Sequence, residues 1–326
     1  MDVESFPGCE SPHPLPRSNV CTRPDVGAGL ALVRVHLVDG TYELFRQFFG
    51  QPPRAGLDGQ EIAATRGVLR SLATMLEEGA THMGVATDHI IESFRNDLWP
   101  GYKTGAGVPP ELASQFPILE DAVVSMGIVV WPMVELEADD ALASAASVTR
   151  DEPAVEQVVI CTPDKDLAQC VVGQHVVQLD RRKGTVLDEE GVKEKYGVYP
   201  RSIPDWLALV GDSADGFPGL PGWGRRSAAV VLDHYGTLDA IPDKVSDWDP
   251  SLRRSVRGSN NLASRLAQER RLALLFRDLA TLRIETGLLS GADALAWQGP
   301  TAEFETTCRE LRDPDLAKQV SLLAPA

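Results

Sequence analysis

The chain has 326 residues, with 47 acidic and 31 basic side chains and a formal net charge of −16 at pH 7. Its hydrophobic fraction of 43% and charged fraction of 24% are ordinary for a globular protein long enough to bury a sizeable core. The sequence contains no run of about 18 apolar residues, so we expect no membrane span. The negative balance, taken alone, argues against nucleic-acid binding, because proteins that bind nucleic acids usually carry a basic surface.

The N-terminal region differs in composition from the rest of the chain. Residues 1–28 are rich in proline, serine and other polar residues, and they lack the basic and apolar regions of a secretory signal. We interpret residues 1–28 as a disordered tail and expect a cytoplasmic protein. The five cysteines are odd in number and irregularly spaced, which argues against a disulfide framework or a zinc site.

Short apolar runs alternate with helical patterns along the first half of the chain. The runs that predict buried strands cover residues 31–38, 81–87, 127–132, 156–162 and 174–179. Residues 61–79, 118–127 and 138–150 predict helices between them. Strands that alternate with helices indicate an α/β fold with a mostly parallel sheet covered by helices on both faces. After a hairpin-like turn at residues 181–185, most of the chain predicts helices and loops.

Acidic residues follow four of the predicted strands. In chain order they are Asp39, Asp88, the group Glu137, Asp139 and Asp140, and the pair Asp164 and Asp166. A further pair, Asp212 and Asp215, is three residues apart, so both would point the same way on a helical turn. Because the carboxyl ends of parallel strands open on one edge of a sheet, we expect these acids to converge there.

Such a cluster of carboxylates requires compensation. Two carboxylates at close range cannot both ionise freely, so either some are protonated or cations share the site. A site made only of carboxylate oxygens suits Mg²⁺ or Mn²⁺, and two such ions about 4 Å apart can activate a water and stabilise the leaving oxygen of a phosphodiester. Each acid alone could be a helix cap or a favourable first-turn charge. A phosphoaspartyl or nucleotide site is a further alternative, but the glycine-rich phosphate loops of such sites are absent from the sequence.

Two other segments carry features that suit a nucleic acid. In residues 216–227, glycines alternate with proline and bulky residues before a helix that starts near Arg225, a pattern that lets backbone N–H groups approach phosphates. The segment from residue 89 to 111 is long for a crossover and mixes Phe94, Trp99 and Tyr102 with Arg95 and Lys103, so it could stack on bases and neutralise phosphates. The alternatives are an ordinary interhelical turn and a surface loop with tucked-in aromatic residues.

The motifs together resemble the bacterial 5′→3′ exonuclease and flap-endonuclease family, which includes the N-terminal nuclease domain of DNA polymerase I. The matching segments are LVDG, SFRNDLWPGYKTG, LEADDALAS, TPDKDLAQ, GDSADGFPGLPGWGRRSA and YGTLDAI, and they span roughly residues 30 to 245. The resemblance implies a PIN-like α/β nuclease core with a helix–three-turn–helix (H3TH) subdomain that binds DNA. We therefore expect a core at residues 29–200 with a helical arch around 89–111, an H3TH subdomain at 201–285 and a C-terminal extension at 286–326.

The resemblance also implies roles for individual residues. Two Mg²⁺ or Mn²⁺ ions would be bound by Asp39, Asp88, Glu137, Asp139, Asp140, Asp164, Asp166, Asp212 and Asp215. The basic arch residues Arg95 and Lys103 would hold the scissile phosphate. DNA would contact Phe94, Tyr102, Gly222, Trp223, Gly224, Arg225, Arg226 and Ser227. In some family members backbone carbonyls also bind K⁺, which would correspond here to Leu209, Val210, Pro218, Leu220 and Trp223.

This chain departs from the family pattern at a few positions. It has Ala214-Asp215-Gly216 where Ser-Asp-Asn is frequent, Arg226 where lysine is common and Trp99 where tyrosine is frequent. No basic residue follows Lys103 within the arch segment. The acid set is complete, so these departures concern the grip on the substrate more than the chemistry. Bound cations would offset part of the acidic cluster, and a few local basic residues would bind DNA with a strong dependence on salt.

The leading hypothesis is a metal-dependent, structure-selective 5′→3′ exonuclease or flap endonuclease that acts by two-metal-ion catalysis. Its partners would be DNA with 5′ ends, flaps or branches, without any membrane, and we expect a monomer. Within the acidic segment, Glu137 and Asp139 are expected to contact metal, whereas Asp140 is expected either to contact it or to act as a capping group. The alternatives are a non-catalytic protein that binds branched DNA and a PIN-type ribonuclease.

Overall fold

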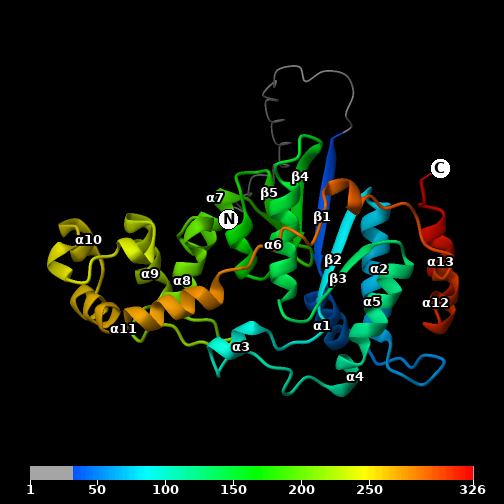
Figure 1. The fold of residues 1–326 in the computed structure, drawn as a ribbon, viewed down its shortest axis with the longest axis horizontal. Coiled ribbons are helices and arrows are strands. Elements are labelled where there is room, and N and C mark those ends of the chain that lie inside the picture. Colours follow the sequence, from blue (N-terminus) through cyan, green and yellow to red (C-terminus); the bar gives the residue numbers. More distant parts are fainter. Residues whose placement is uncertain (1–31, 326) are drawn as a thin grey trace, which may run out of the picture. The chain divides into compact units, whose positions relative to one another are not determined.

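The computed structural model describes residues 32–325. The expected tail at residues 1–28 lies outside the described residues. The first 150 described residues build most of a six-stranded sheet with the order β3-β2-β1-β4-β5-β6 (Figure 1). Its strands are β1 (Val33–Asp39), β2 (His82–Asp88), β3 (Val129–Met133), β4 (Val155–Cys161), β5 (Val176–Asp180) and β6 (Thr185–Leu187). The neighbouring pairs from β3 through β5 are parallel, and the short β6 pairs antiparallel with β5 through the predicted hairpin turn.

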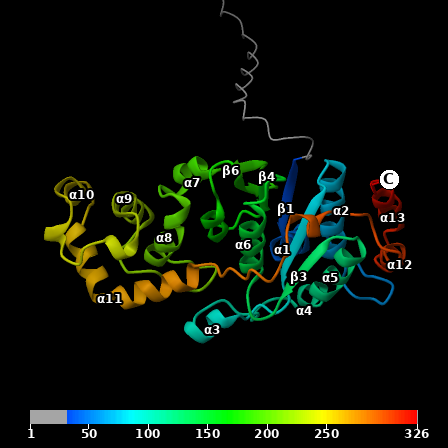
Figure 2. The ribbon, with the colours of Figure 1, turned by 45° about the horizontal axis from the view of Figure 1, so that its top comes forward.

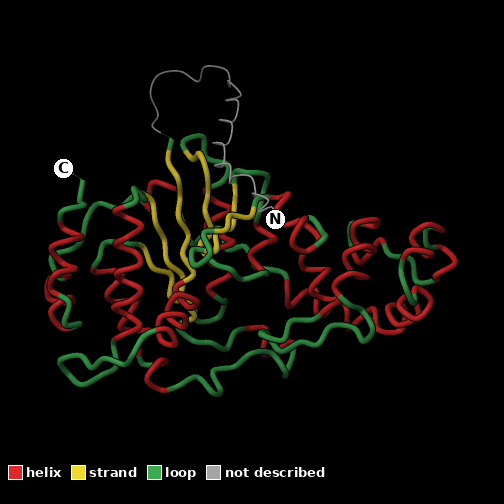
Figure 3. Tube along the Cα trace, turned by 180° about the vertical axis from the view of Figure 1, so that it is seen from behind, coloured by secondary structure: helices red, strands yellow, loops and turns green. Residues whose placement is uncertain are grey.

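Helices cover both faces of the sheet, as the alternating pattern predicted (Figure 3). On one face lie α1 (Gly40–Gly50), α2 (Ala63–Glu77) and α5 (Gln115–Ser125), and on the other lies α6 (Ala138–Thr149). The two faces of β1 show why: Val38 belongs to the apolar cluster with α2, whereas Leu37 belongs to the cluster with α6. Successive side chains of a strand point to opposite faces, so a strand buried on both faces reads as a continuous apolar run.

The chain between residues 189 and 280 is helical and has its own apolar core (Figure 2). Its helices are α7 (Glu189–Tyr196), α8 (Ile203–Val210), α9 (Arg225–Tyr235), α10 (Pro250–Ser255) and α11 (Ser259–Ala280). Short 3-10 turns occur at Asp166–Cys170 (η1), Pro200–Ser202, Leu238–Ala240, Val245–Asp247 and Ala292–Leu295. None of the helices within residues 32–325 combines the length and apolar character needed to cross a bilayer.

The segment expected to form a helical arch contains little helix. It holds α3 (Phe94–Leu98), which has five residues, and the start of α4 (Pro110–Ala113). The residues between them form turns and irregular structure. Glycine and proline at positions 100, 101, 105, 107 and 109 explain the break, because both residue types disfavour a continuous helix.

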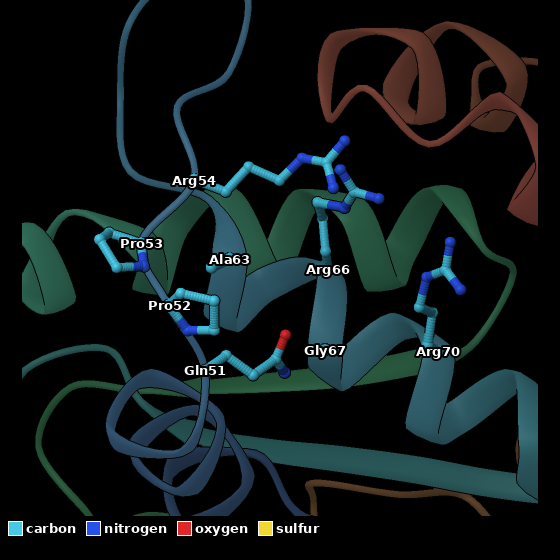
Figure 4. A pocket seen from close by; sticks show the side chains of 8 residues that line it. All are labelled: Gln51, Pro52, Pro53, Arg54, Ala63, Arg66, Gly67 and Arg70. Atoms are coloured by element: carbon cyan, nitrogen blue, oxygen red, sulfur yellow. The ribbon is translucent and has the colours of Figure 1, made fainter.

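The C-terminal residues form part of the core rather than a separate appendage. The helices α12 (Phe304–Glu310) and α13 (Pro314–Ser321) pack against α5 and α2, and Phe304 and Val320 join the same apolar cluster as Val38. Just before α13, the Asp313 carboxylate pairs with Arg66 and Arg70 of α2. These two arginines and Arg54 border a hollow of about 620 Å³ (Figure 4).

Candidate active site

Asp39 and Asp88 end two adjacent strands at the same edge of the sheet. Asp39 caps α1, because its Oδ1 accepts a hydrogen bond of 2.8 Å from the Tyr42 N–H, while its Oδ2 accepts one of 2.8 Å from the Thr162 hydroxyl. Asp88 Oδ1 accepts a hydrogen bond of 2.7 Å from the Ala138 N–H at the start of α6. Strand ends and helix starts thereby hold both carboxylates at one place.

Asp139 and Asp164 complete a first group of acids at this edge. Burial raises the pKa of Asp39 to about 7, and the charges of Asp88 and Asp164 add to that shift. Burial also raises the pKa of Asp139 well above its ordinary value, with contributions from Asp164, Asp39 and Asp88. Since the charges of neighbouring acids contribute to the raised pKa of both Asp39 and Asp139, the four acids lie close together, as expected from their places after the strands.

A second group consists of Asp166, Asp212 and Asp215. One carboxylate oxygen of each lies within 4.8 Å of the other two. Asp166 Oδ1 is buried and has no hydrogen-bond partner among the described residues. Burial raises the pKa of Asp215 to about 6, opposed by Lys103 and reinforced by Asp212 and Glu137. The acids that follow β4 therefore meet those of the loop after α8, although about 50 residues separate them in the chain.

Two lysines supply positive charge to these acids. Lys103 Nζ lies 2.7 Å from Glu137 Oε2 and 3.5 Å from Asp215 Oδ1. Although burial opposes its charge, Glu137, Asp215 and Asp88 raise the pKa of Lys103 well above its ordinary value. Lys165 Nζ lies 2.5 Å from Asp212 Oδ2. The sequence reasoning missed Lys165; its position between Asp164 and Asp166 was the available signal.

Arg95 and Asp140 form a buried pair. The side chain of Arg95 is 1% exposed and that of Asp140 is fully buried. Two hydrogen bonds of 2.8 Å join the guanidinium to the Asp140 carboxylate, and a third of 3.0 Å reaches Glu137 Oε1. Burial opposes the charges of Arg95 and Glu137. The hydrogen bonds and charges of Asp140 and Glu137 nevertheless raise the pKa of Arg95, and Lys103 and Arg95 lower the pKa of Glu137.

This pairing changes the expected roles of two residues. Arg95 also donates to the carbonyl oxygens of Leu279 and Thr281, so in this structure its guanidinium is fully engaged with protein acceptors rather than presented to a phosphate as we expected of an arch residue. Asp140 accepts two further hydrogen bonds, from the N–H groups of Glu137 and Arg283. Of the two roles left open for Asp140, the structure therefore favours the capping one.

The aromatic residues of the arch segment are packed inward. Tyr102 is 4% exposed, and its hydroxyl donates to Glu137 Oε2 at 3.3 Å, so its ring is not available to stack on a base in this structure. Phe94 lies against the guanidinium groups of Arg95 and Arg283. Trp99 Nε1 donates to the Gly216 carbonyl oxygen at 3.1 Å. A hydrogen bond therefore links the arch segment to the loop that contains Asp215.

The glycine-rich turn from Gly222 to Ser227 presents its glycines and arginines to solvent. Gly222, Gly224, Arg225 and Arg226 are exposed, whereas Trp223 is only 5% exposed and packs near Trp248. Ser227 Oγ accepts a hydrogen bond from the Gly224 N–H, which closes the start of α9. The N–H groups of that first turn lack intrahelical acceptors and favour anions.

The carbonyl groups expected to bind K⁺ lie at the end of α8 and in the loop between α8 and α9. The Leu209 oxygen already accepts the Leu220 N–H at 2.9 Å, and the Leu220 oxygen accepts the Trp223 N–H at 3.1 Å. Each of these oxygens retains a second lone pair. The K⁺ assignment stays a prediction.

Known sequences and structures resemble this chain over most of its length. Residues 34–197 match the family model described as "5'-3' exonuclease, N-terminal resolvase-like domain", and residues 198–303 match "5'-3' exonuclease, C-terminal SAM fold". DNA polymerase I of Pseudomonas aeruginosa is 36% identical over 260 residues, which cover 77% of this chain but only 27% of the polymerase. The 5'-3' exonuclease of Buchnera aphidicola is 31% identical, with 76% of this chain and 81% of that protein covered.

Solved structures share the fold at low sequence identity. The T5 D15 protein co-crystallised with metal ions has a TM-score of 0.60 and 17% identity, covering 90% of this chain and all of that one. The catalytic core of Rad2 in complex with DNA substrate has a TM-score of 0.61 and 14% identity, covering 91% and 93%. These likenesses confirm the predicted PIN-like architecture, and the two matching family models together with the Buchnera relative show that this chain belongs to the 5′-3′ exonuclease family.

Proposed function

We propose that this protein is a divalent-metal-dependent 5′→3′ exonuclease and 5′-flap endonuclease that hydrolyses DNA phosphodiester bonds. The observation that carries the proposal is the convergence of two carboxylate groups, one around Asp39 and Asp139 and one around Asp212 and Asp215, at a single edge of the sheet. Family membership supports the same reaction. A stable fold gains nothing from so much mutual repulsion unless cations offset it.

The donor set fits divalent ions that prefer oxygen. Every candidate ligand is a carboxylate, which suits Mg²⁺ or Mn²⁺, and the unpartnered Asp166 Oδ1 is free to accept a cation. Asp39, Asp88, Asp139 and Asp164 would hold one ion, and Asp166, Asp212 and Asp215 a second. When bound, such ions supply a water made nucleophilic at neutral pH and stabilise charge on the leaving oxygen.

The protein's own groups would orient the substrate around this edge. Lys103 is the basic arch residue beside the acids whose side chain stays partly exposed, at 24%. We propose that its ammonium stabilises the charge that develops on the scissile phosphoryl group. We assign Arg95 a positioning role instead, because its guanidinium donates a hydrogen bond to Glu137 Oε1 and so orients that carboxylate. Glu137 is oriented by four donors in all, since Ser93 Oγ also donates to its Oε1 at 2.6 Å, and the Tyr102 hydroxyl and Lys103 contact its Oε2.

The turn from Gly222 to Ser227 would grip duplex DNA without reading its sequence. Backbone N–H groups and the exposed Arg225 and Arg226 suit phosphate oxygens, which position a duplex but carry no base information. The Rad2 core was solved with a DNA substrate and the T5 D15 protein with metal ions, which agrees with both parts of the proposal. A K⁺ ion bound by the carbonyl oxygens expected for it, those of Leu209, Val210, Pro218, Leu220 and Trp223, would add a further phosphate contact.

A cleavage assay with purified protein tests the proposal. We expect Mg²⁺-dependent release of the flap from a 5′-flap DNA duplex, and loss of that release by a factor of at least about a thousand in Asp139→Ala. No cleavage by the natural sequence, or equal cleavage by Asp139→Ala, would contradict the proposal. Binding of branched DNA without cleavage, unaffected by Mg²⁺, would favour a non-catalytic DNA-binding protein. Faster cleavage of a matched RNA flap would favour a ribonuclease.

A further inference from the structure

Lys165 forms an ion pair with one acid of the second carboxylate group, Asp212. It lies in the turn between β4 and η1, and its Nζ is 2.5 Å from Asp212 Oδ2. The Asp212 side chain is 2% exposed, whereas that of Lys165 is 28% exposed. The ammonium therefore reaches a buried carboxylate from the solvent side, and it can leave that carboxylate more easily than a buried partner could.

The same Asp212 carboxylate is also one of the three that could hold an ion. One oxygen each from Asp166, Asp212 and Asp215 lies within 4.8 Å of the others, and Asp166 Oδ1 has no donor among the described residues. A divalent ion at these oxygens would lie within a few ångströms of the Lys165 ammonium. Two cations that close repel strongly in a partly buried site, so ion and ammonium compete for Asp212.

A hollow beside Lys165 offers the ammonium another position. The hollow measures about 330 Å³, and its lining includes Lys165, Asp212, Ser213, Trp206, Gly224 and Arg225. The start of α9 forms part of this lining. Arg225 is exposed there, and the N–H groups of the first turn favour phosphate. A Lys165 side chain that leaves Asp212 therefore has room in a hollow that Arg225 also lines.

We propose that Lys165 is a displaceable internal counter-ion: a divalent ion displaces its ammonium from Asp212, and the ammonium then contacts a DNA phosphate beside Arg225. Lys165 is thus a positioning residue that couples ion binding to DNA binding. By thermodynamic linkage the coupling is reciprocal, so DNA that engages Lys165 also strengthens ion binding. This inference rests on the proposed function, because it presumes that the carboxylates hold divalent ions.

The first test measures ion binding without DNA. Titration of Mn²⁺, followed by electron paramagnetic resonance, should show about tenfold tighter binding in Lys165→Gln, because the competing charge is gone while the amide can still donate to Asp212. Lys165→Arg retains the charge and should bind Mn²⁺ like the natural sequence. Lys193→Met is the matched control, since Lys193 pairs with Asp233 of α9. Unchanged or weaker Mn²⁺ binding in Lys165→Gln would overturn the proposal.

The second test measures DNA binding with and without the ion. Anisotropy of a labelled 5′-flap duplex should show that Ca²⁺ strengthens binding by the natural sequence about tenfold more than binding by Lys165→Gln, with a gel confirming that the duplex stays intact. In EDTA the two proteins should bind alike. An equal loss of affinity in EDTA and in Ca²⁺ would mean that Lys165 is an ordinary phosphate contact, which also overturns the coupling.

The two tests separate this proposal from the proposed function. If the natural sequence binds no Mn²⁺ and cleaves no flap, the proposed function fails. If it binds Mn²⁺ and cleaves, but Lys165→Gln lacks either the tighter Mn²⁺ binding or the reduced Ca²⁺ effect, only the role of Lys165 fails. Thermal melts of each variant verify folding; should Lys165→Gln melt early, Lys165→Met provides the same loss of charge in a second background.

Discussion

At the scale of single residues, the buried guanidinium of Arg95 is the clearest case in which tertiary contacts set a role. Its five hydrogen bonds join α3 to the start of α6 and to the end of α11. A guanidinium provides five N–H donors in a rigid fork, and here each finds an acceptor. The residue therefore fixes Glu137 and Asp140 relative to the helical region.

Removal of Arg95 should destabilise the fold strongly. In Arg95→Ala the carboxylates of Glu137 and Asp140 lose their shared partner inside the protein, and a broken buried pair costs about 3–5 kcal/mol. We expect a loss of that size in the free energy of unfolding measured with urea. Arg201→Ala, at an exposed position, should change it by less than about 0.5 kcal/mol. A loss under about 1 kcal/mol for Arg95→Ala would refute the structural role.

The carboxylates at the sheet edge predict a dependence of stability on pH and metal. The folded-state pKa of Asp39 is about 7, against an ordinary value of 3.8, so the folded protein binds more protons than the unfolded chain between those values. Without metal, this group's contribution to stability is therefore fully present below pH 4 and is lost as the pH rises through 7. Asp215, with a pKa of about 6, acts in the same direction.

Divalent ions should reverse this loss. Because protons compete with the ion for the same oxygens, Mg²⁺ should raise the melting temperature by several degrees at pH 7.5 and by much less at pH 5. Differential scanning fluorimetry with and without EDTA measures the difference. Asp39→Asn should lose most of the Mg²⁺ effect at pH 7.5. An Mg²⁺ effect of the same size at both pH values would show that the ion binds away from these acids.

At the scale of elements, the carboxylate of Asp313 forms the ion pairs that link the last two helices to α2. Asp313 precedes α13, its side chain is 4% exposed, and it forms two hydrogen bonds of 2.7 Å with Arg70. It also lies 3.1 Å from Arg66, whose side chain is 9% exposed. The exposed Arg70 contributes little, because solvent screens it, so the pair with Arg66 carries most of the effect.

Asp313→Ala should therefore loosen the packing of α12 and α13. The change leaves Arg66 buried without its carboxylate, and we expect a loss of about 3 kcal/mol in the free energy of unfolding. Asp315→Ala is the matched control, since its side chain is 89% exposed and its partner lysine is 3.9 Å away. Hydrogen exchange should show faster opening of residues 304–321 in Asp313→Ala only. Equal free energies of unfolding for the two variants would contradict a stabilising role of the Asp313–Arg66 pair.

The start of α9 is the element that we expect to bind the DNA backbone. Arg225→Ala combined with Arg226→Ala should weaken binding to a flap duplex about equally for different sequences and reduce the slope of log K against log salt by about 2. Both arginines are exposed, so the melting temperature should stay the same. An unchanged salt slope would place the phosphate contacts elsewhere.

At the scale of the whole molecule, the net charge and the proposed substrate are compatible because the charges are unevenly placed. Many acids lie at one edge of the sheet, where bound ions would offset their charge. Arg225 and Arg226 are exposed, and Arg225 lines the same hollow as Asp212. A formal charge of −16 therefore describes the sum and not the surface that DNA would meet. Composition alone argued against nucleic acid, whereas the order of the motifs supports the proposed DNA substrate.

The sequence by itself determined the sheet and its acidic edge. Apolar runs of strand length, alternating with helices, led to five of the six strands, and acids placed directly after parallel strands must meet at one edge because all those strands end there. The family followed from the same motifs. The positions of Asp39, Asp88, Asp139 and Asp164 were predictable on this basis, since the first two end strands and the other two follow the ends of β3 and β4.

Only the tertiary structure decided which charged groups pair. Arg95 meets carbonyl oxygens more than 180 residues away, Lys165 meets Asp212 across a gap of 47 residues, and Asp313 meets α2 from the far end of the chain. Such contacts leave no periodic signal in the sequence, because each depends on how two separate elements pack and on which side chain excludes water there. Burial and ion pairing then give a basic residue such as Arg95 structural contacts, although its motif predicts a phosphate ligand.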